Sequence, residues 1–434
     1  MNKIFKLSAV LVLAVLTCVP LRAQESEGEK ELVYRRSSLY PVLLETNPVF
    51  DDEDVSELNE LVMNSYGKAP FPDKYNDHRL EHVRFKFSDY ADVSPEELEE
   101  DESADEQKGR KKDQIYIQAS EKFLKDKDVA RGLVAKWFNR QEDGTFDMSM
   151  IHERGSYDAS AMQVQLASGS IRGMAMLKDA GEELIKNTFV VFNRMKFVKN
   201  EPIARAIRDV AYATADQLAN EIARIATKTA ADALYESTKD GYSVWTVSYL
   251  YQLEWNDDIA NQFYMDMWMD TTSISEERKE LFETTDIFKL NFVGYEKSKS
   301  LVMFGAGRSK EEIIQVATIR NIDRTYVKLQ KSYDVFKTKT PIVSTDPIVA
   351  KIGMKEGVER GDKFDVLEMV IDKEGLTKYE KVGKVKVKKK DWVWDNRYDL
   401  STEDVDGGTE EDLKGTQFKG GRKIMSGMLL RQVK

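Results

Sequence analysis

Apolar side chains recur every three or four residues along much of this chain, which is the spacing of one face of an α-helix. The longest such run follows Pro202, a residue that suits the first turn of a helix, and continues until Gly241. We expect one long amphipathic helix there, and its flanking alanines would let a neighbour approach closely. Its apolar stripe consists of Ile203, Ile207, Ala211, Ala215, Leu218, Ile222 and Ile225.

Further helices are predicted over 54–65, 129–138 and 175–185, where the same spacing recurs. Two capping boxes mark helix starts later in the chain, because a serine followed three residues later by a glutamate can satisfy free backbone amides. Ser273 with Glu276 should begin a short helix. Ser309 with Glu312 should begin a longer one that continues to about Leu329.

Other segments alternate apolar and polar residues, which is the spacing of a strand with one buried face. The clearest is 242–255, where aromatic residues from Trp245 to Trp255 share one face. Asn256-Asp257-Asp258 can turn the chain, so we expect 263–269 to return as an antiparallel partner. Strands are also expected over 83–87, 189–192 and 288–292.

This order of elements predicts an α+β fold, with helices packed on a mainly antiparallel central sheet over 113–340. The preceding segment, 24–112, should hold a short helix and a strand. It should end in a disordered charged insertion, because 95–113 has almost nothing apolar to bury. After Pro341, short alternating strands are separated by glycines, which predicts a small all-β barrel or sandwich over 346–434.

Residues 1–23 have the layout of a cleavable secretory signal, with two lysines, an apolar run from Leu7 to Val19 and a cleavage point after Ala23. We therefore expect an exported protein of the periplasm or the outer membrane. The one cysteine, Cys18, lies in this leader, and Thr17 before it disfavours a lipid-anchor site. Cleavage removes three positive charges from a net charge of −11, leaving −14 and no thiol. Disulfides and thiolate chemistry are then excluded.

The acidic charge also argues against nucleic acid as the main partner, since phosphate binding needs clustered lysine and arginine. One basic run exists, from Lys384 to Lys390. Because Val385 and Val387 alternate with its lysines, we interpret it as a strand with one solvated face. Contact with an anionic envelope surface is the alternative for this face.

Three histidines are candidate site residues. His78 and His82 are four residues apart, but their surroundings are strand-like, and on a strand side chains four apart are about 13 Å from each other. One ion would need both within about 2 Å, so a metal site is disfavoured. His152 lies near Asp147 and Asp158 without a nucleophile signature, which favours a turn histidine over a general base.

Two loops are candidate binding sites. Residues 304–309 offer an incomplete phosphate-binding motif, since Lys310 stands where a dinucleotide fingerprint has its third glycine, and a turn with a capping box is favoured. Asp404-Val405-Asp406-Gly407 with Glu410 and Glu411 has its glycine too early for an EF-hand calcium loop. No catalytic, cofactor-binding or metal residue is therefore predicted. The aromatic strand 242–255 also suits an outer-membrane strand of an oligomer.

Several segments spread over most of the chain resemble a family of uncharacterised exported proteins of Bacteroides-type Gram-negative bacteria. This resemblance implies the cell envelope and no particular activity. A fainter likeness of fold links the helix and strand up to 192 to envelope proteins of the curli-secretion type. The segments that resemble the exported family are Arg36-Ser37-Ser38-Leu39-Tyr40, Pro72-Asp73-Lys74-Tyr75-Asn76-Asp77-His78, Leu133-Val134-Ala135-Lys136-Trp137-Phe138-Asn139-Arg140, Asp179-Ala180-Gly181-Glu182-Glu183-Leu184-Ile185, Ala350-Lys351-Ile352-Gly353-Met354-Lys355-Glu356-Gly357 and Gly427-Met428-Leu429-Leu430-Arg431-Gln432.

From the sequence we expect a non-enzymatic envelope protein that binds or assembles through contacts with an envelope protein or polymer. No cofactor is expected, whereas peripheral association with the outer membrane and homo-oligomerisation are compatible with the chain. Two alternatives stay open. One is a secreted hydrolase whose paired carboxylates come from distant segments, and the other is an oligomeric outer-membrane assembly component.

Overall fold

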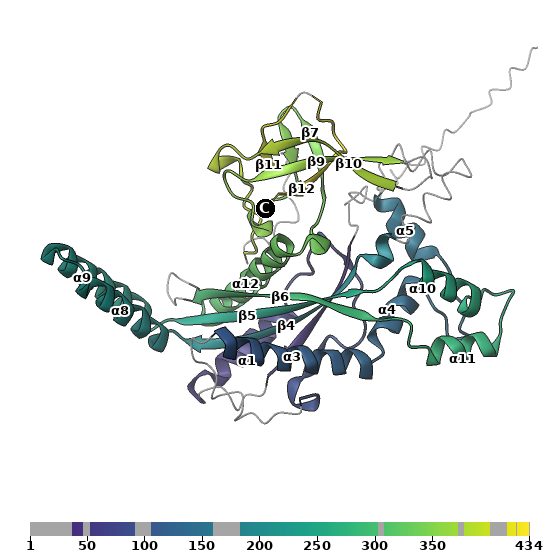
Figure 1. The fold of residues 1–434 in the computed structure, drawn as a ribbon, viewed down its shortest axis with the longest axis horizontal. Helices are drawn as coiled ribbons and strands as arrows, with labels where there is room; N and C mark the ends of the chain where they lie inside the picture. Colours follow the sequence, from purple (N-terminus) through teal and green to yellow (C-terminus); the bar gives the residue numbers. More distant parts are fainter. Residues whose placement is uncertain are drawn as a thin grey trace, which may run out of the picture. The chain divides into compact units, whose positions relative to one another are not determined.

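The computed structural model describes residues 37–46, 53–91, 106–158, 183–302, 308–371, 377–399, 415–421 and 423–433. The predicted leader 1–23, the helix predicted from 175 up to residue 182, and the calcium-loop candidate at 404–411 lie outside the described residues. Helices and strands are mixed throughout the described part, and its two sheets are rich in antiparallel pairs (Figure 1). The predicted α+β class is therefore confirmed.

The central sheet has six strands in the order β2-β1-β4-β5-β6, with β3 also paired to β1. Strands β4, β5 and β6 run antiparallel to one another, whereas β1 is parallel to β2, β3 and β4. The sheet thus includes strands that precede residue 113. Its strands are β1 (Ser38–Glu45), β2 (Asn76–Asp77), β3 (Arg84–Lys86), β4 (Thr188–Lys199), β5 (Tyr242–Leu253) and β6 (Leu290–Val302).

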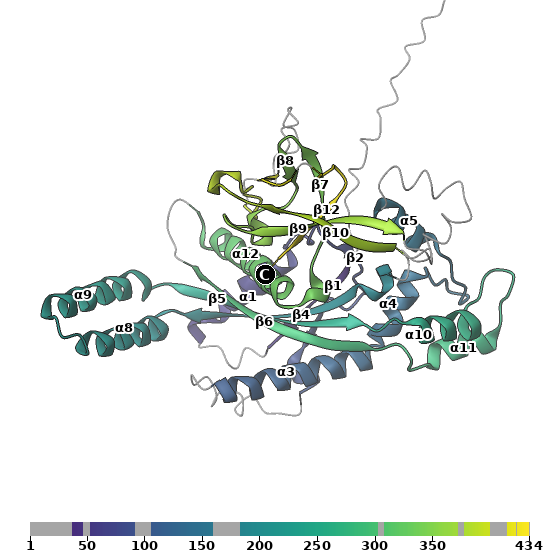
Figure 2. The same cartoon turned by 45° about the horizontal axis from the view of Figure 1, so that its top comes forward.

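Each face of the central sheet carries its own hydrophobic core, because successive side chains of a strand point to opposite faces. Val190 and Phe192 of β4 belong to the core under α3 (Glu106–Asp126) and α4 (Val129–Trp137). Phe189 and Val191 belong to the core under α1 (Glu53–Gly67) and α12 (Lys310–Ser332). Figure 2 shows α3 and α12 on opposite sides of the sheet. Among the described residues, no helix is both long and apolar enough to cross a bilayer.

Two predictions on the first of these faces are wrong. Residues 106–113, expected to be disordered, form the start of α3, and Asp113 is buried beneath the sheet. The expected return strand 263–269 is helical instead, with α10 (Asp257–Gln262) followed by a π-helix over Phe263–Met267. The reason is local: Asn256 Oδ1 accepts the N–H of Ile259 at 3.0 Å and so caps a helix where a turn was expected. The segment's aromatic rings then pack in the core.

The long helix predicted after Pro202 is also wrong, because the structure has two helices, α8 (Glu201–Asp216) and α9 (Glu221–Thr238). Asn220 separates them: its side chain accepts the N–H groups of Ile222 and Ala223 and begins a new helix. The two helices lie side by side as a hairpin that joins β4 to β5 (Figures 1 and 2).

Helix α12 matches its prediction. Ser309 Oγ accepts the N–H of Glu312, and Glu312 Oε2 accepts the N–H of Ser309, so both halves of the capping box form. Its predicted stripe is buried: Val316, Ile319, Ile322, Tyr326 and Leu329. The earlier box is displaced, since α11 (Glu276–Thr284) is capped by Ser275 instead of Ser273.

Helix α12 also bonds to the backbone of β6, the last strand of the sheet. Tyr333, just after the helix, accepts the N–H of Tyr295 at 3.1 Å and donates to its carbonyl at 3.2 Å. Arg324 donates to the carbonyl of Lys299 at 2.8 Å, and Lys328 donates to that of Lys297. Gly294 allows this approach, because a Cβ there would lie 2.2 Å from the Tyr333 ring.

The C-terminal part forms a second six-stranded sheet in the order β10-β9-β12-β7-β8-β11. The short, mostly antiparallel strands predicted here are present, but a closed barrel is not seen among the described residues. The outermost strands β10 and β11 meet only at a bridge between Lys386 and Lys419, and β11 has three residues. The strands are β7 (Thr340–Thr345), β8 (Ile348–Ala350), β9 (Lys363–Ile371), β10 (Thr377–Lys386), β11 (Thr416–Phe418) and β12 (Leu429–Gln432).

Candidate functional site

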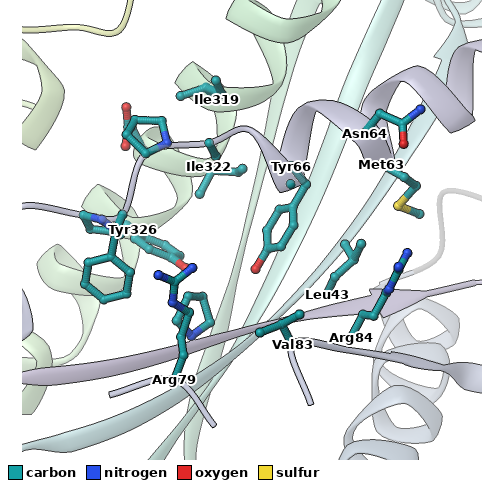
Figure 3. Close-up of a pocket in the computed structure, with 17 residues that line it drawn as sticks. Leu43, Met63, Asn64, Tyr66, Arg79, Val83, Arg84, Ile319, Ile322 and Tyr326 are labelled. Atoms are coloured by element: carbon teal, nitrogen blue, oxygen red, sulfur yellow. The ribbon is translucent and has the colours of Figure 1, made fainter. Parts of the chain in front are cut away.

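A cavity of about 360 Å³ lies between α1, the segment that follows it, β1 and α12 (Figure 3). Pro70 and Pro72 end the helical conformation after α1 and carry the chain across the cavity. Most of the wall is apolar, as is usual for sites that bind small molecules. The apolar lining includes Pro41, Leu43, Met63, Ala69, Phe71, Val83, Ile319 and Ile322.

Two tyrosine hydroxyls and one guanidinium group provide polar atoms in this wall. Figure 3 shows Tyr66 from α1, Tyr326 from α12 and Arg79 pointing toward one another. Asn193 of β4 lies behind the tyrosines: its Nδ2 donates to Tyr66 at 3.2 Å and to Tyr326 at 3.1 Å. Ser248 Oγ donates to Asn193 Oδ1 at 2.6 Å, which fixes the orientation of the amide.

This arrangement leaves both phenolic protons available. Each hydroxyl accepts one hydrogen bond from Asn193, and among the described residues neither hydroxyl has an acceptor for its own proton. Burial raises the pKa of Tyr66 to about 12 and raises that of Tyr326 well above its usual range. Both are therefore neutral O–H donors near pH 7, and each can donate its proton to an acceptor that enters the cavity.

Two arginines line the open side of the cavity. Arg79 donates from Nε to Asp77 at 3.0 Å and stacks over the ring of Phe71, with 5.2 Å from Cζ to the ring centroid. Arg84 forms a longer contact of 3.4 Å with Glu45, and its side chain is mostly exposed. Both guanidinium groups thus stand where an anionic group could approach from solvent.

One carboxyl group on the wall is strongly perturbed. Burial raises the pKa of Asp323 on α12 to about 7, nearby Lys355 opposes this rise, and Glu356 and Asp73 add to it. Lys355 Nζ is itself paired with Asp73 at 3.2 Å. Asp323 is the one described carboxyl whose pKa is raised above its ordinary value. Among the described residues, no second carboxyl with a raised pKa therefore faces it across the cavity.

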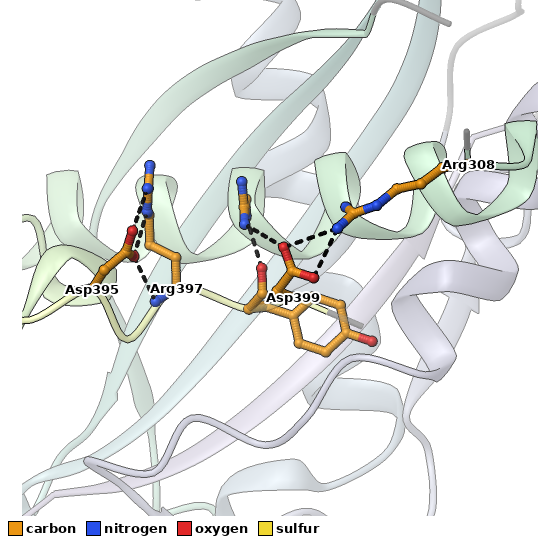
Figure 4. A network of polar contacts seen from close by, with 6 residues as sticks. Arg308, Asp395, Arg397 and Asp399 are labelled. Atoms are coloured by element: carbon orange, nitrogen blue, oxygen red, sulfur yellow. Dashed lines mark hydrogen bonds and ion pairs between the residues drawn. The ribbon is translucent and has the colours of Figure 1, made fainter. Parts of the chain in front are cut away.

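Asp323 also lines a larger groove of about 1180 Å³ between α12 and residues 354–360 and 390–397. Cations follow one another along α12 at steps of four, four and three residues: Arg320, Arg324, Lys328 and Lys331. Arg320 shares Asp399 with Arg308, at 3.3 and 2.9 Å, and Arg397 pairs with Asp395 (Figure 4). The other three α12 cations bond to backbone carbonyls and have no carboxylate partner among the described residues.

The histidines considered from the sequence are not brought together as a site. His78 is buried, its Nε2 lies 3.0 Å from the carbonyl of Leu133, and its Nδ1 lies 2.8 Å from Nη1 of Arg154. Burial, and then Arg154, lower its pKa well below the usual value, so it is neutral. His82 packs edge-on against Phe123, and His152 is exposed on α5 (Ser149–Asp158). No group of three or more potential metal ligands occurs in the described residues.

The remaining candidates from the sequence lie elsewhere. Val385 and Val387 are buried while Lys384 and Lys386 are exposed, so the predicted solvated basic face is present, although the strand β10 ends at Lys386. The aromatic residues of β5 lie in the core, with Trp245 partly exposed. Residues 304–307 lie outside the described part.

The cavity itself was not predicted. Its lining comes from segments almost 300 residues apart in the chain, and none of them carries a motif. Compared with known proteins, the chain matches no family model and is significantly similar to no curated protein.

Proposed function

We propose that this chain is a non-enzymatic cell-envelope protein that binds a small molecule in the cavity between α1 and α12. The observation that carries the proposal is the pair of neutral phenols, Tyr66 and Tyr326, whose protons have no acceptor among the described residues. A ligand oxygen that accepts from both would satisfy the two donors at once. The envelope assignment rests on the leader pattern of residues 1–23.

The chemistry of the wall specifies the ligand class. An apolar body would fill the space lined by Leu43, Ile319 and Ile322, and an acceptor-only head group would meet the tyrosines. A carboxylate suits this position best, because Arg79 lies beside the hydroxyls and Arg84 lies on the same wall. An ammonium head group beside the hydroxyls would instead meet two donors and Arg79, and Asp323 is the one carboxyl group among the residues that line the cavity.

The hydrolase alternative has less support. Glycoside hydrolysis by carboxylates needs an acid and a second carboxylate on opposite sides of the substrate. Asp323 has the raised pKa of an acid, whereas the pKa of nearby Asp73 is lowered overall, since Lys355 and Lys74 outweigh the effect of burial. Ligand binding therefore explains the residues of the cavity wall with fewer assumptions than hydrolysis does.

The test uses the mature chain and three probes of equal length: octanoate, octylamine and octanol. We expect octanoate to bind by calorimetry and to raise the melting temperature, with octanol weaker and octylamine weakest. Replacing both tyrosines, in the variant Y66F/Y326F, removes two hydrogen bonds to a charged group. At roughly 1.5 kcal/mol or more each, this should weaken octanoate binding by about a hundredfold or more.

Tyr75→Phe is the matched control, because Tyr75 lies in the same core and also loses a buried hydroxyl, but it does not line the cavity. The control should bind octanoate as the wild type does. Equal binding of all three probes, or wild-type binding by Y66F/Y326F, would contradict the proposal. Turnover of an ester or glycoside that Asp323→Asn abolishes would favour the hydrolase. Fractionation of cells with the leader intact tests the envelope assignment.

A further inference from the structure

The groove between α12 and residues 354–360 and 390–397 is basic, although the chain as a whole is acidic. Nine lysines and arginines line it, against two acidic residues, Asp323 and Glu359. Burial raises the pKa of Asp323 to about 7, so this carboxyl carries only part of its negative charge near neutral pH. The groove is therefore a concentrated positive site on a protein whose net charge is −11, and it attracts anionic ligands.

More than half of these cations are available to a ligand. Three aspartates, Asp73, Asp395 and Asp399, pair with four of them, and Figure 4 shows the pairs made by Asp395 and Asp399. The other five are exposed and have no carboxylate partner among the described residues: Arg324, Lys328, Lys331, Arg360 and Lys390. A guanidinium has five N–H donors and an ammonium has three, so the bonds of the α12 cations to single carbonyls leave donors for a ligand.

The cations on α12 are regularly spaced along the groove. Arg320, Arg324 and Lys328 are four residues apart on one side of the helix, which places them about 6 Å apart along its axis. In an extended peptide, every second side chain points to the same side, at intervals of about 6.6 Å. Acidic residues at alternate positions of an extended peptide can therefore meet successive cations of α12.

We propose that this groove binds an extended acidic segment of a partner protein, with its acidic side chains on the α12 cations. Clusters of arginine and lysine recognise such segments through charge-assisted hydrogen bonds. Val327, Val358 and Val393 also line the groove and would contact the apolar side chains that lie between the acids. The inference goes beyond the ligand cavity and does not depend on it, although Asp323 lines both sites.

Other polyanions fit the groove less well. Single-stranded nucleic acids are usually held by aromatic side chains on which the bases stack, and no described residue that lines the groove is aromatic. An anionic bilayer presents a flat surface, whereas these cations line both sides of a groove. An acidic polysaccharide has the charge but no aliphatic side chains to contact the valines. An acidic peptide supplies both.

Fluorescence anisotropy with labelled probes tests the class of ligand on the mature chain. The main probe is a twelve-residue peptide of alternating glutamate and threonine, because threonine favours the extended conformation. A peptide of the same composition with its six glutamates in one block is the matched probe. It turns half of its acids away from α12, so we expect it to bind about tenfold more weakly. Added salt should weaken both complexes.

Heptathymidylate and hexagalacturonate carry the same six negative charges without a peptide backbone. Both should bind more weakly than the alternating peptide. Tighter binding of heptathymidylate would assign the groove to nucleic acid, and tighter binding of hexagalacturonate would assign it to a polysaccharide; either result would overturn the proposal. Equal affinity for the alternating and the block peptide would also overturn it, because the argument from spacing would then fail.

Substitutions locate the site. The variant R324Q/K328Q/K331Q removes three cations of α12 and should weaken binding of the alternating peptide by about tenfold or more. Arg324 and Lys328 also bond to β6, so R360Q/K390Q is the second variant: it leaves α12 intact, removes two exposed cations from the opposite side and should weaken binding severalfold. Wild-type affinity in both variants would overturn the proposal.

The matched control is K384Q/K386Q/K388Q, which removes three exposed cations from the end of β10 and the residues after it, outside the groove. It should bind the alternating peptide as the wild type does, and an equal loss in this variant would show that the peptide responds only to net charge.

The chain's own acids are a possible competitor, since residues 403–412 contain six of them soon after Asp399. The alternating peptide is therefore also titrated into a variant in which these six acids are replaced by their amides. Tighter binding by this variant would support the groove as the site. Absence of binding by both this variant and the wild type would refute it.

Discussion

Replacing Asp323 with asparagine should stabilise the protein at alkaline pH. The substitution keeps the size of the side chain and removes a charge that α12 holds in a poorly solvated position beside the cavity. The pKa of this carboxyl is about 7 in the folded chain, against an ordinary value of 3.8. The folded state therefore binds the proton more tightly than the unfolded state does.

The sign of the pH dependence follows from that difference. Below about pH 4 both states are protonated and the contribution of Asp323 to stability is fully present; it is lost progressively as the pH rises to about 7. At 1.36 kcal/mol per pKa unit, the full difference corresponds to about 4 kcal/mol. Because water reaches the carboxyl from the cavity, we expect about 2 kcal/mol of this to be expressed.

Urea unfolding at pH 4.5, 6 and 8 measures the effect. Asp323→Asn should be more stable than the wild type by about 2 kcal/mol at pH 8, with the difference shrinking toward zero at pH 4.5. Asp286→Asn is the control, because Asp286 is exposed in a loop, and it should track the wild type at every pH. If Asp323→Asn is less stable than the wild type at pH 8, the carboxylate is stabilised by its surroundings and the argument from burial fails.

Two further substitutions test local geometry. Gly294→Ala places a Cβ 2.2 Å from the Tyr333 ring and should lower the free energy of unfolding by about 2–3 kcal/mol. The control is Gly383→Ala, whose nearest contact is 4.0 Å away and which should change the free energy of unfolding by less than about 0.5 kcal/mol. Equal effects would show that Tyr333 moves aside freely. Ser309→Ala removes half of the capping box of α12 and should lower the free energy of unfolding by about 1 kcal/mol, and Ser309→Asp should restore most of this loss. If Ser309→Ala is as stable as the wild type, the cap contributes nothing to stability.

The sequence correctly predicted those helices and strands whose formation depends on residues close to one another in the chain. The capping box at Ser309 and the apolar stripe of α12 are examples, because both depend on residues within one helix. The failures have local causes too. Asn256 caps a new helix where the polar run 256–258 indicated a turn before a return strand. Asn220 caps another where the spacing of apolar residues indicated one continuous helix.

The candidate site could not be predicted from such local signals. Tyr66 and Tyr326 meet only because α1 and α12 cover the same face of the sheet, and Asn193 binds both from a strand that is distant from each in sequence. The stripe that was predicted for one helix after Pro202 is divided between α8 and α9, and several of its residues are exposed.

The bonds from α12 to β6 have a consequence for how copies of this protein can meet. The last strand of a sheet normally offers a row of free amides and carbonyls, onto which a strand from another molecule can add. Here Tyr333, Arg324 and Lys328 occupy such groups at Tyr295, Lys299 and Lys297. An incoming strand would have to displace these side chains to pair with Tyr295, Lys297 and Lys299. Growth of the central sheet by strand addition is thereby obstructed along this margin.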